Sequence, residues 1–169
     1  YETIVVKQLS PTIGAEISGI DLSKDLSDAQ FEEVRRALDE NLAVIFRDQN
    51  FSQDQHKKLA HRFGKSLHRH ELAATRFKGG GEYDPEVLSW KTGKDSRFTA
   101  GDGWHADVTC DPSPIAYSLL RVTKTPPIGG DTAFANMYLA YEFLSEPIKN
   151  LLDGLTAIHR PDSKAYKLI

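Results

Sequence analysis

The apolar and polar positions near the N-terminus follow patterns that predict short strands. Residues 4–6 form a β-branched run, and residues 15–18 alternate between apolar and polar before Gly19. Both patterns are typical of strands that end at turn residues. Residues 42–46 are a continuous apolar run of strand length, which predicts a third, buried strand.

A helix is predicted between the second and third of these strands. Ser27 is followed three residues later by Gln30, which is the pattern of a capping box. Apolar residues then recur at helical spacing, namely Phe31, Val34, Ala37 and Leu38. We therefore expect an amphipathic helix over residues 28–40.

A second helix is predicted after the third strand. Ser52 and Gln55 repeat the capping-box pattern. The helix should run to about Phe63 and end at Gly64, because glycine is a common helix terminator.

Residues 70–103 show no comparable regularity. They contain Gly79-Gly80-Gly81, many polar residues and few periodic apolar ones, so we expect a long loop. Loops of that length inside compact domains are usually functional or disordered. Residues 87–90 are the one stretch within the loop that could form a strand.

Further strands are predicted in the last third of the chain. Residues 115–122 have strand character, and residues 125–130 form a turn rich in proline and glycine. Residues 131–135 resume an extended segment after that turn. A final strand is expected over residues 155–159.

Two short helices are predicted between these extended segments, near residues 137–144 and 147–152. Pro147 suits the first position of a helix, where its missing N–H costs nothing. Gly154 suits a C-terminal cap. The order of strands and helices shows no internal repeat and no βαβ rhythm.

Composition narrows the class of protein. The chain has 169 residues, 40% of them hydrophobic and 27% charged, so we expect one globular domain over residues 1–169. A net charge of −3 gives no basic footprint for nucleic acid, and no apolar run has the length of a membrane span. The single Cys110 excludes an intrachain disulfide framework and agrees with a reducing cytoplasm.

A candidate metal pair lies in the motif Trp104-His105-Ala106-Asp107. If residues 104–109 are extended, His105 and Asp107 point to the same face, because strand side chains repeat every two residues. An imidazole and a carboxylate are two thirds of the facial triad that holds Fe(II). The alternative is an ordinary hydrogen-bonded pair without a metal, since a lone His-x-Asp motif is weak evidence.

Two longer motifs change this balance, because they are those of a known family. Trp-His-x-Asp-Val-Thr stands at residues 104–109, and Gly-Gly-Asp-Thr stands at residues 129–132. Further matches lie at residues 13–19, 46–49, 62–64, 141–145 and 152–155. In these motifs and their order the chain resembles the taurine dioxygenase family of Fe(II)- and 2-oxoglutarate-dependent dioxygenases, over almost its whole length.

The resemblance implies roles for individual residues. His105 and Asp107 match the first two iron ligands, and Thr132 matches the threonine whose hydroxyl binds a carboxylate of the co-substrate 2-oxoglutarate. Without the family, Thr132 would be an ordinary threonine of high strand propensity after a turn. The third iron ligand, a histidine, and an arginine that pairs with 2-oxoglutarate are expected beyond Ile169, outside this chain.

The resemblance also bears on the substrate. The family places a substrate-binding histidine soon after the second helix, where His70 is the preferred candidate and His68 the other. A solvated loop histidine is the alternative for either position. Gly101 and Ala73 replace an asparagine and a tyrosine of the taurine enzyme, so polar groups that would hold a sulfonate are lost, and taurine itself is disfavoured.

The implied fold is mainly β with flanking α-helices, a double-stranded β-helix (jelly roll) that is incomplete in this chain. The implied reaction is hydroxylation of a small organic acid, such as a sulfonate or alkyl sulfate, with molecular oxygen and conversion of 2-oxoglutarate to succinate. The loop at residues 70–103 is expected to act as a lid over the site. Alternatives are an aryloxyalkanoate or amino-acid-like substrate, or a non-catalytic remnant of the fold. Assembly of the chain into a homo-oligomer is a further alternative to a monomer.

Overall fold

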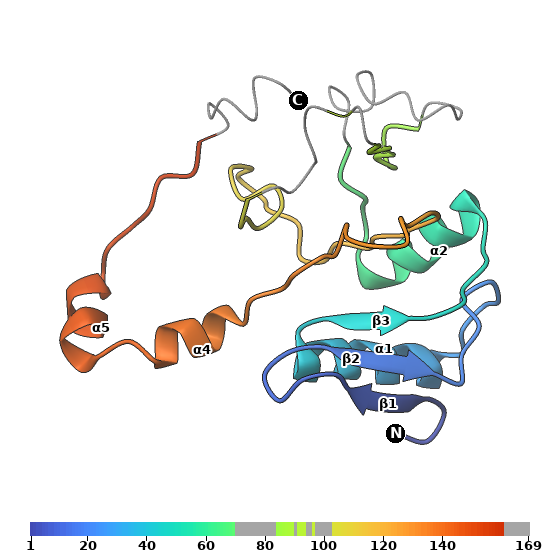
Figure 1. Ribbon diagram of the computed structural model, residues 1–169, viewed down its shortest axis with the longest axis horizontal. Coiled ribbons are helices and arrows are strands. Elements are labelled where there is room, and N and C mark those ends of the chain that lie inside the picture. The colour runs from blue at the N-terminus through green and yellow to red at the C-terminus, as the bar shows by residue number, and fades with distance from the viewer. Residues whose placement is uncertain (70–83, 90, 94–95, 97–102, 161–169) are drawn as a thin grey trace. The chain divides into compact units, whose positions relative to one another are not determined.

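The computed structural model describes residues 1–69, 84–89, 91–93, 96 and 103–160. The chain divides into two compact units, each considered by itself below. The first comprises Tyr1–Arg62 with Arg121–Leu155, and the second comprises Phe63–Leu120 with Thr156–Ile169. Figure 1 shows the secondary structure of both.

A three-stranded mixed sheet lies in the first unit (Figure 1). Strand β1 (Val5–Gln8) pairs antiparallel with β2 (Ala15–Ser18), and β2 pairs parallel with β3 (Val44–Phe46). The first two strands were predicted from their apolar patterns, and both predictions are confirmed.

Helix α1 (Asp28–Asn41) connects β2 to β3 and packs against both strands. Ser27 accepts a hydrogen bond from the backbone N–H of Gln30, and the Gln30 side chain accepts one from Ser27, so the predicted capping box is present. The buried apolar side chains of α1 are Phe31, Val34 and Ala37. The predicted helix and its apolar face are therefore confirmed.

The packing of α1 on the sheet forms the core of this unit. Ile17 of β2 and Val34 of α1 are each 2% exposed. Complete burial of such a side chain contributes roughly 1.5–3 kcal/mol, a large share of the net stability of a typical domain. The buried hydrophobic residues of the described part of the chain are Ile4, Ala15, Ile17, Leu22, Leu26, Phe31, Val34, Ala37 and Phe51.

The predicted third strand is shorter and less buried than expected. Leu42 caps α1 in the left-handed conformation (φ 65°), and its N–H donates to the carbonyl of Leu38. The chain needs this residue to reverse direction between helix and sheet, so the strand begins only at Val44. The predicted strand is therefore confirmed over Val44–Phe46, but all three of its residues are half-buried, so the expected start at residue 42 and the expected burial were wrong.

Helix α2 (Gln53–Phe63) matches the prediction at both ends. The capping box of Ser52 and Gln55 forms, with hydrogen bonds of 2.6 and 3.2 Å. Arg62 in the last turn binds the start of α1. Its guanidinium donates to Asp28 Oδ1 at 2.7 Å and lies 4.4 Å above the ring of Phe31. This contact anchors α2 to the buried side of α1.

Helices α4 (Met137–Glu142) and α5 (Glu146–Leu152) were also predicted from sequence. Asn136 caps α4 and donates a 2.7 Å hydrogen bond to the carbonyl of Thr12, which ties this segment to the hairpin of the same unit. Gly154 has the positive φ (77°) expected after the end of α5. Among the described residues, no helix combines the length and apolar character needed to cross a membrane.

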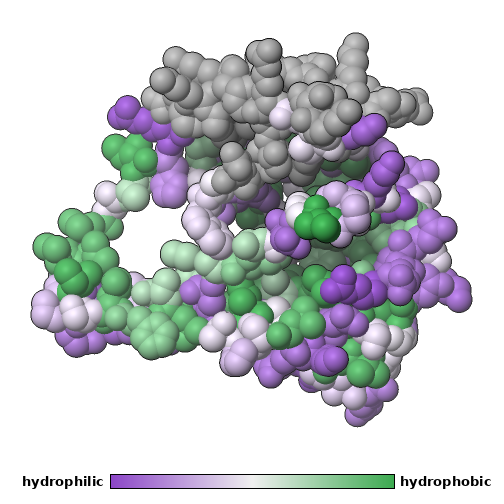
Figure 2. Space-filling model, in the orientation of Figure 1, coloured by the Kyte–Doolittle hydropathy of each residue, from purple (hydrophilic) through white to green (hydrophobic). Residues whose placement is uncertain are grey.

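Apolar side chains of α4, α5 and the turn between them are exposed. Figure 2 shows many apolar residues at the surface around α5. They include Met137, Tyr138, Tyr141, Phe143, Ile148, Leu151 and Leu152. Each of these two helices presents apolar surface without a buried face of its own.

The other predicted strands are absent. Residues 115–122, 131–135, 155–159 and 87–89 are described, and none of them forms a strand. A strand exists only when a neighbouring segment exchanges backbone hydrogen bonds with it, and no described segment pairs with these residues. Val122 is 60% exposed, so its apolar side chain is not buried as it would be in the core face of a sheet. Trp90, the last residue of the 87–90 prediction, lies outside the described residues.

Glu33 of α1 holds the segment that leads into β1. Its carboxylate accepts hydrogen bonds from the backbone N–H groups of Glu2 at 2.7 Å, Thr3 at 2.9 Å and Ile4 at 3.2 Å, and from the Thr3 hydroxyl at 2.8 Å. These donors, the Glu2 N–H first among them, stabilise the charged form and lower the pKa of Glu33 from 4.5 to about 2. The anchor therefore depends on the ionised carboxylate.

Replacing Glu33 with glutamine is expected to lower the free energy of unfolding at pH 7. Because the pKa is depressed in the folded state, the carboxylate stabilises the fold above pH 4.5, and its contribution is lost as the pH falls toward 2. Urea unfolding of the natural chain and Glu33→Gln should therefore differ at pH 7 and converge near pH 2. Glu32→Gln, which removes only an exposed ion pair to Arg35, is the control. A difference of equal size at both pH values would contradict this role.

Candidate metal centre

The motif that carries the candidate ligands is a turn. Trp104, His105 and Ala106 have irregular backbone, and a turn begins at Asp107. Val108 has a φ of 54°, which is rare for a β-branched residue, and the N–H of Asp111 donates to its carbonyl at 3.1 Å. Residues 104–109 are therefore not one extended segment, which was the condition under which the spacing placed His105 and Asp107 on one face.

The two candidate side chains nevertheless meet. Nε2 of His105 lies 3.2 Å from Oδ1 of Asp107, and each side chain is about half exposed (53% and 48%). Nδ1 of His105 lies 2.7 Å from the carbonyl oxygen of Gly103. A carbonyl oxygen can only accept, so the proton of this hydrogen bond belongs to Nδ1. Nε2, which faces the carboxylate, is therefore the nitrogen without a proton in the neutral imidazole.

The second oxygen of Asp107 is also bound. The hydroxyl of Ser118 donates to Oδ2 at 2.6 Å. The neighbouring Tyr117 ring packs against Phe63, with ring centroids 5.4 Å apart and planes tilted by 55°. All of these residues belong to the second unit. Sequence reasoning did not identify Ser118, because a serine eleven residues after the motif carries no periodic or motif signal.

The pair fits two adjacent ligands of one metal ion. With the proton on Nδ1, Nε2 and Oδ1 are two acceptors that face each other, an arrangement in which both can bind one cation. Two ligand atoms about 2.1 Å from one ion and at right angles lie about 3 Å apart, which agrees with the 3.2 Å observed. A second proton on His105 would satisfy the same geometry as an ion pair. Among the described residues, no group of three His, Cys, Asp or Glu side chains could hold a metal.

The remaining predicted site residues are placed as follows. His68 is half-buried and belongs to the second unit. Thr132 is exposed and belongs to the first unit, whereas His105 and Asp107 belong to the second. His70, the preferred substrate residue, lies outside the described residues, as do Ala73, Gly101 and most of the predicted lid at 70–103.

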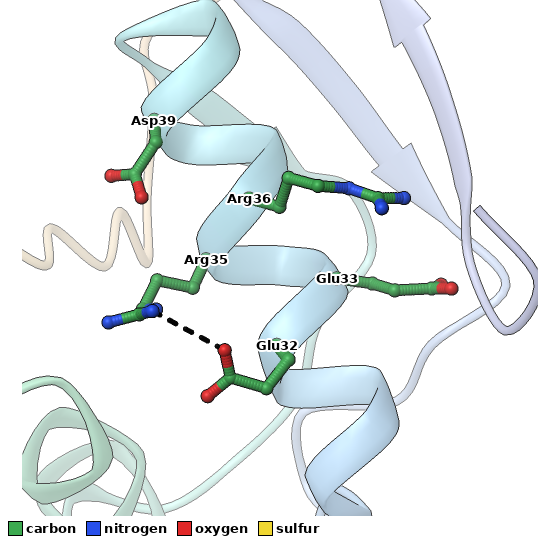
Figure 3. A pocket seen from close by; sticks show the side chains of 5 residues that line it. All are labelled: Glu32, Glu33, Arg35, Arg36 and Asp39. Atoms are coloured by element: carbon green, nitrogen blue, oxygen red, sulfur yellow. Dashed lines mark ion pairs between the residues drawn. The ribbon is translucent and has the colours of Figure 1, made fainter.

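A surface hollow elsewhere has no such chemistry. Figure 3 shows it on α1, lined by Glu32, Glu33, Arg35, Arg36 and Asp39. Acidic and basic side chains are interspersed there, and Glu32 and Arg35 form an ion pair of 3.5 Å. Such a pattern is typical of a solvated helix face. The candidate chemistry of the described residues therefore lies at the His105 motif.

Comparison with known proteins identifies the family. The model of the taurine catabolism dioxygenase TauD, TfdA family matches residues 6–167. The chain belongs to this family, and the resemblance of its motifs is confirmed.

Individual relatives agree. An α-ketoglutarate-dependent sulfonate dioxygenase of Saccharomyces cerevisiae is 33% identical over 95% of this chain and 40% of its own length. An α-ketoglutarate-dependent 2,4-dichlorophenoxyacetate dioxygenase of Cupriavidus pinatubonensis is 31% identical over 93% of this chain and 58% of its own. The crystal structure of a taurine dioxygenase from Burkholderia xenovorans superposes with a TM-score of 0.78 at 37% identity, covering 94% of this chain and 54% of that one. The chain thus spans about half the length of these relatives.

The turn before Thr132 contains two glycines whose backbone conformation can be tested by substitution. Gly129 and Gly130 both have a φ of 77°, and a Cβ atom on Gly130 would lie 3.3 Å from Cγ of Pro126. Gly130→Ala is therefore expected to destabilise the chain by about 1 kcal/mol or more in urea unfolding, because an L side chain is strained at this φ. Gly93→Ala, where a Cβ atom meets nothing within 4 Å, is the control. Equal stability of both variants would show that the turn does not require glycine.

Proposed function

We propose that the protein is an Fe(II)- and 2-oxoglutarate-dependent dioxygenase that hydroxylates a small organic acid, such as a sulfonate or alkyl sulfate. The observation that carries this proposal is the 3.2 Å approach of His105 Nε2 to Asp107 Oδ1 within the family's motif. The reaction consumes one molecule of oxygen. One oxygen atom enters a substrate C–H bond, and the other enters the succinate that forms, with carbon dioxide, from 2-oxoglutarate.

Three residues of this chain would hold the metal and the co-substrate. His105 would bind the metal through Nε2 while Gly103 fixes its ring through Nδ1, and Asp107 would bind through Oδ1. The third ligand, a second histidine outside the described residues, would complete the triad. Bound Fe(II) supplies the redox chemistry that couples decarboxylation to hydroxylation. The hydroxyl of Thr132 would donate a hydrogen bond to a carboxylate of 2-oxoglutarate.

The proposed substrate class is an anionic acid, which requires hydrogen-bond donors for its acid group. His70, the preferred candidate, or alternatively His68 would supply an N–H donor to the acid group. Hydroxylation of the carbon beside a sulfonate or sulfate oxygen gives a product that fragments and releases sulfite or sulfate. The sulfonate named for the yeast relative favours this class, whereas the 2,4-dichlorophenoxyacetate named for the bacterial relative favours an aryloxyalkanoate as the second candidate.

The finer fold and setting are part of the same proposal. The complete protein would form a double-stranded β-helix, to which this chain contributes the His105 turn and the exposed apolar surface of α4 and α5. It would act in the cytoplasm, in keeping with the single cysteine of this chain, Cys110. Its partners would be small molecules and oxygen.

The first test is turnover. The full protein encoded by the gene, supplied with Fe(II), 2-oxoglutarate and oxygen, should form succinate when sulfonates, alkyl sulfates or aryloxy acids are added. His105→Ala and Asp107→Ala should reduce this to background, because each removes a metal ligand, while His61→Ala, an exposed histidine on α2, should not. Full activity of His105→Ala would refute the assigned site. Absence of turnover with the whole panel would refute the enzymatic function for those classes.

The second test concerns the co-substrate. Thr132→Val keeps the shape of the side chain but removes the hydroxyl donor, so the KM for 2-oxoglutarate should rise about 10-fold or more, as expected for a lost hydrogen bond to a charged group. Thr132→Ser retains the donor and should stay near the natural value. The KM for the organic acid should not change in either variant. An unchanged KM for 2-oxoglutarate in Thr132→Val would remove this residue from the site.

A further inference from the structure

We propose that Ser118 is a positioning residue for the metal centre, because its hydroxyl holds one oxygen of Asp107 and leaves the other to bind the metal. The inference rests on the proposed function, since it assigns Ser118 a role at the same site. It concerns a residue that belongs to none of the motifs described above.

The hydrogen bond distinguishes the two oxygens of Asp107. Ser118 Oγ donates to Oδ2 at 2.6 Å, and Oδ1 is the oxygen that faces His105 Nε2 at 3.2 Å. A hydroxyl that donates to a carboxylate at this distance makes a strong, charge-assisted bond. The carboxylate can then no longer rotate freely and exchange its oxygens.

A fixed carboxylate has a consequence for coordination. An unrestrained aspartate can bind a cation through both oxygens, which uses two coordination positions. With Oδ2 bound to Ser118, Asp107 offers Oδ1 alone. A site of this class needs open positions for co-substrate and oxygen, so a carboxylate restricted to one oxygen preserves them.

Both ends of this hydrogen bond are held by the surrounding chain. Asp107 precedes Val108, whose left-handed backbone is rare for its residue type and persists only where the neighbouring structure enforces it. Ser118 follows Tyr117, whose ring packs on Phe63 at the end of α2. The ligand side chains are thus oriented from outside, His105 by the Gly103 carbonyl and Asp107 by Ser118. Such outer partners are typical of metal ligands.

The test measures metal affinity rather than activity. In the full protein, without oxygen, Mn(II) binding is titrated by electron paramagnetic resonance in the natural protein, Ser118→Ala and Ser118→Thr. Ser118→Ala should weaken Mn(II) binding about 10–100-fold, the usual effect of removing such an outer partner. Ser118→Thr keeps the hydroxyl and should restore most of the affinity. Ser113→Ala, an exposed serine of the same segment, should bind as the natural protein does.

Two further readouts separate this role from a structural one. The thermal unfolding midpoint of the metal-free protein should be the same for Ser118→Ala and the natural protein. The visible spectrum of bound Co(II) should change in Ser118→Ala, because a second carboxylate oxygen becomes available to the metal. A lowered midpoint that accompanies weaker binding and is not corrected by threonine would overturn the positioning role.

The outcomes also distinguish this inference from the proposed function. If Ser118→Ala binds Mn(II) as tightly as the natural protein while His105→Ala does not bind, the metal site stands and the role of Ser118 is overturned. If the natural protein and His105→Ala bind Mn(II) equally weakly, the metal site fails and the role of Ser118 fails with it.

Discussion

The packing of α1 against β2 is the interaction on which the described fold depends. Val34 from the helix and Ile17 from the strand are the largest fully buried side chains of the described residues. The buried apolar residues of that part of the chain all lie at or before Phe51. The other features of the first unit attach to this core: Glu33 holds the entry to β1, Leu42 returns the chain to β3, and Arg62 fastens α2 to Phe31.

The candidate metal centre is built on a different principle. Its two candidate ligands are each about half exposed, and directional contacts define its geometry. The Gly103 carbonyl, the Ser118 hydroxyl and the left-handed backbone of Val108 together set where Nε2 and Oδ1 point. Hydrogen bonds of this kind are short-ranged, so the arrangement does not require the apolar burial that stabilises the first unit. It does require each partner to stay in place.

Sequence reasoning succeeded where the determinants are local. The capping boxes at Ser27 and Ser52 and the apolar spacing after them determine α1 and α2 almost to the residue. It failed where a neighbour decides the outcome. Residues 115–122 have strand composition, but no described segment pairs with them. The apolar run at residues 42–46 begins with Leu42, which caps α1 instead of joining the strand. Local propensity cannot reveal either effect, because both depend on residues distant in the sequence or on a backbone reversal.

The same division applies to the site. The approach of His105 and Asp107 was predicted from their spacing, although the backbone reaches it through a turn instead of a strand. The role of Nδ1 and the hydrogen bond from Ser118 could not be predicted. The first depends on the carbonyl orientation of Gly103, and the second depends on how the chain folds back over eleven residues.

The exposure of this pair has a consequence for which metal a cell would load. An imidazole and a carboxylate open to solvent on about half their surface would readily exchange a bound metal with the surroundings. Nitrogen and oxygen ligands of this kind bind Ni(II), Cu(II) and Zn(II) more strongly than Fe(II) by the general order of divalent affinities. Affinity at these two side chains alone would therefore favour those ions over the Fe(II) of the proposed function. Correct loading with iron would reflect the supply of free metals in the compartment, and inhibition by trace zinc or copper would follow from the same chemistry.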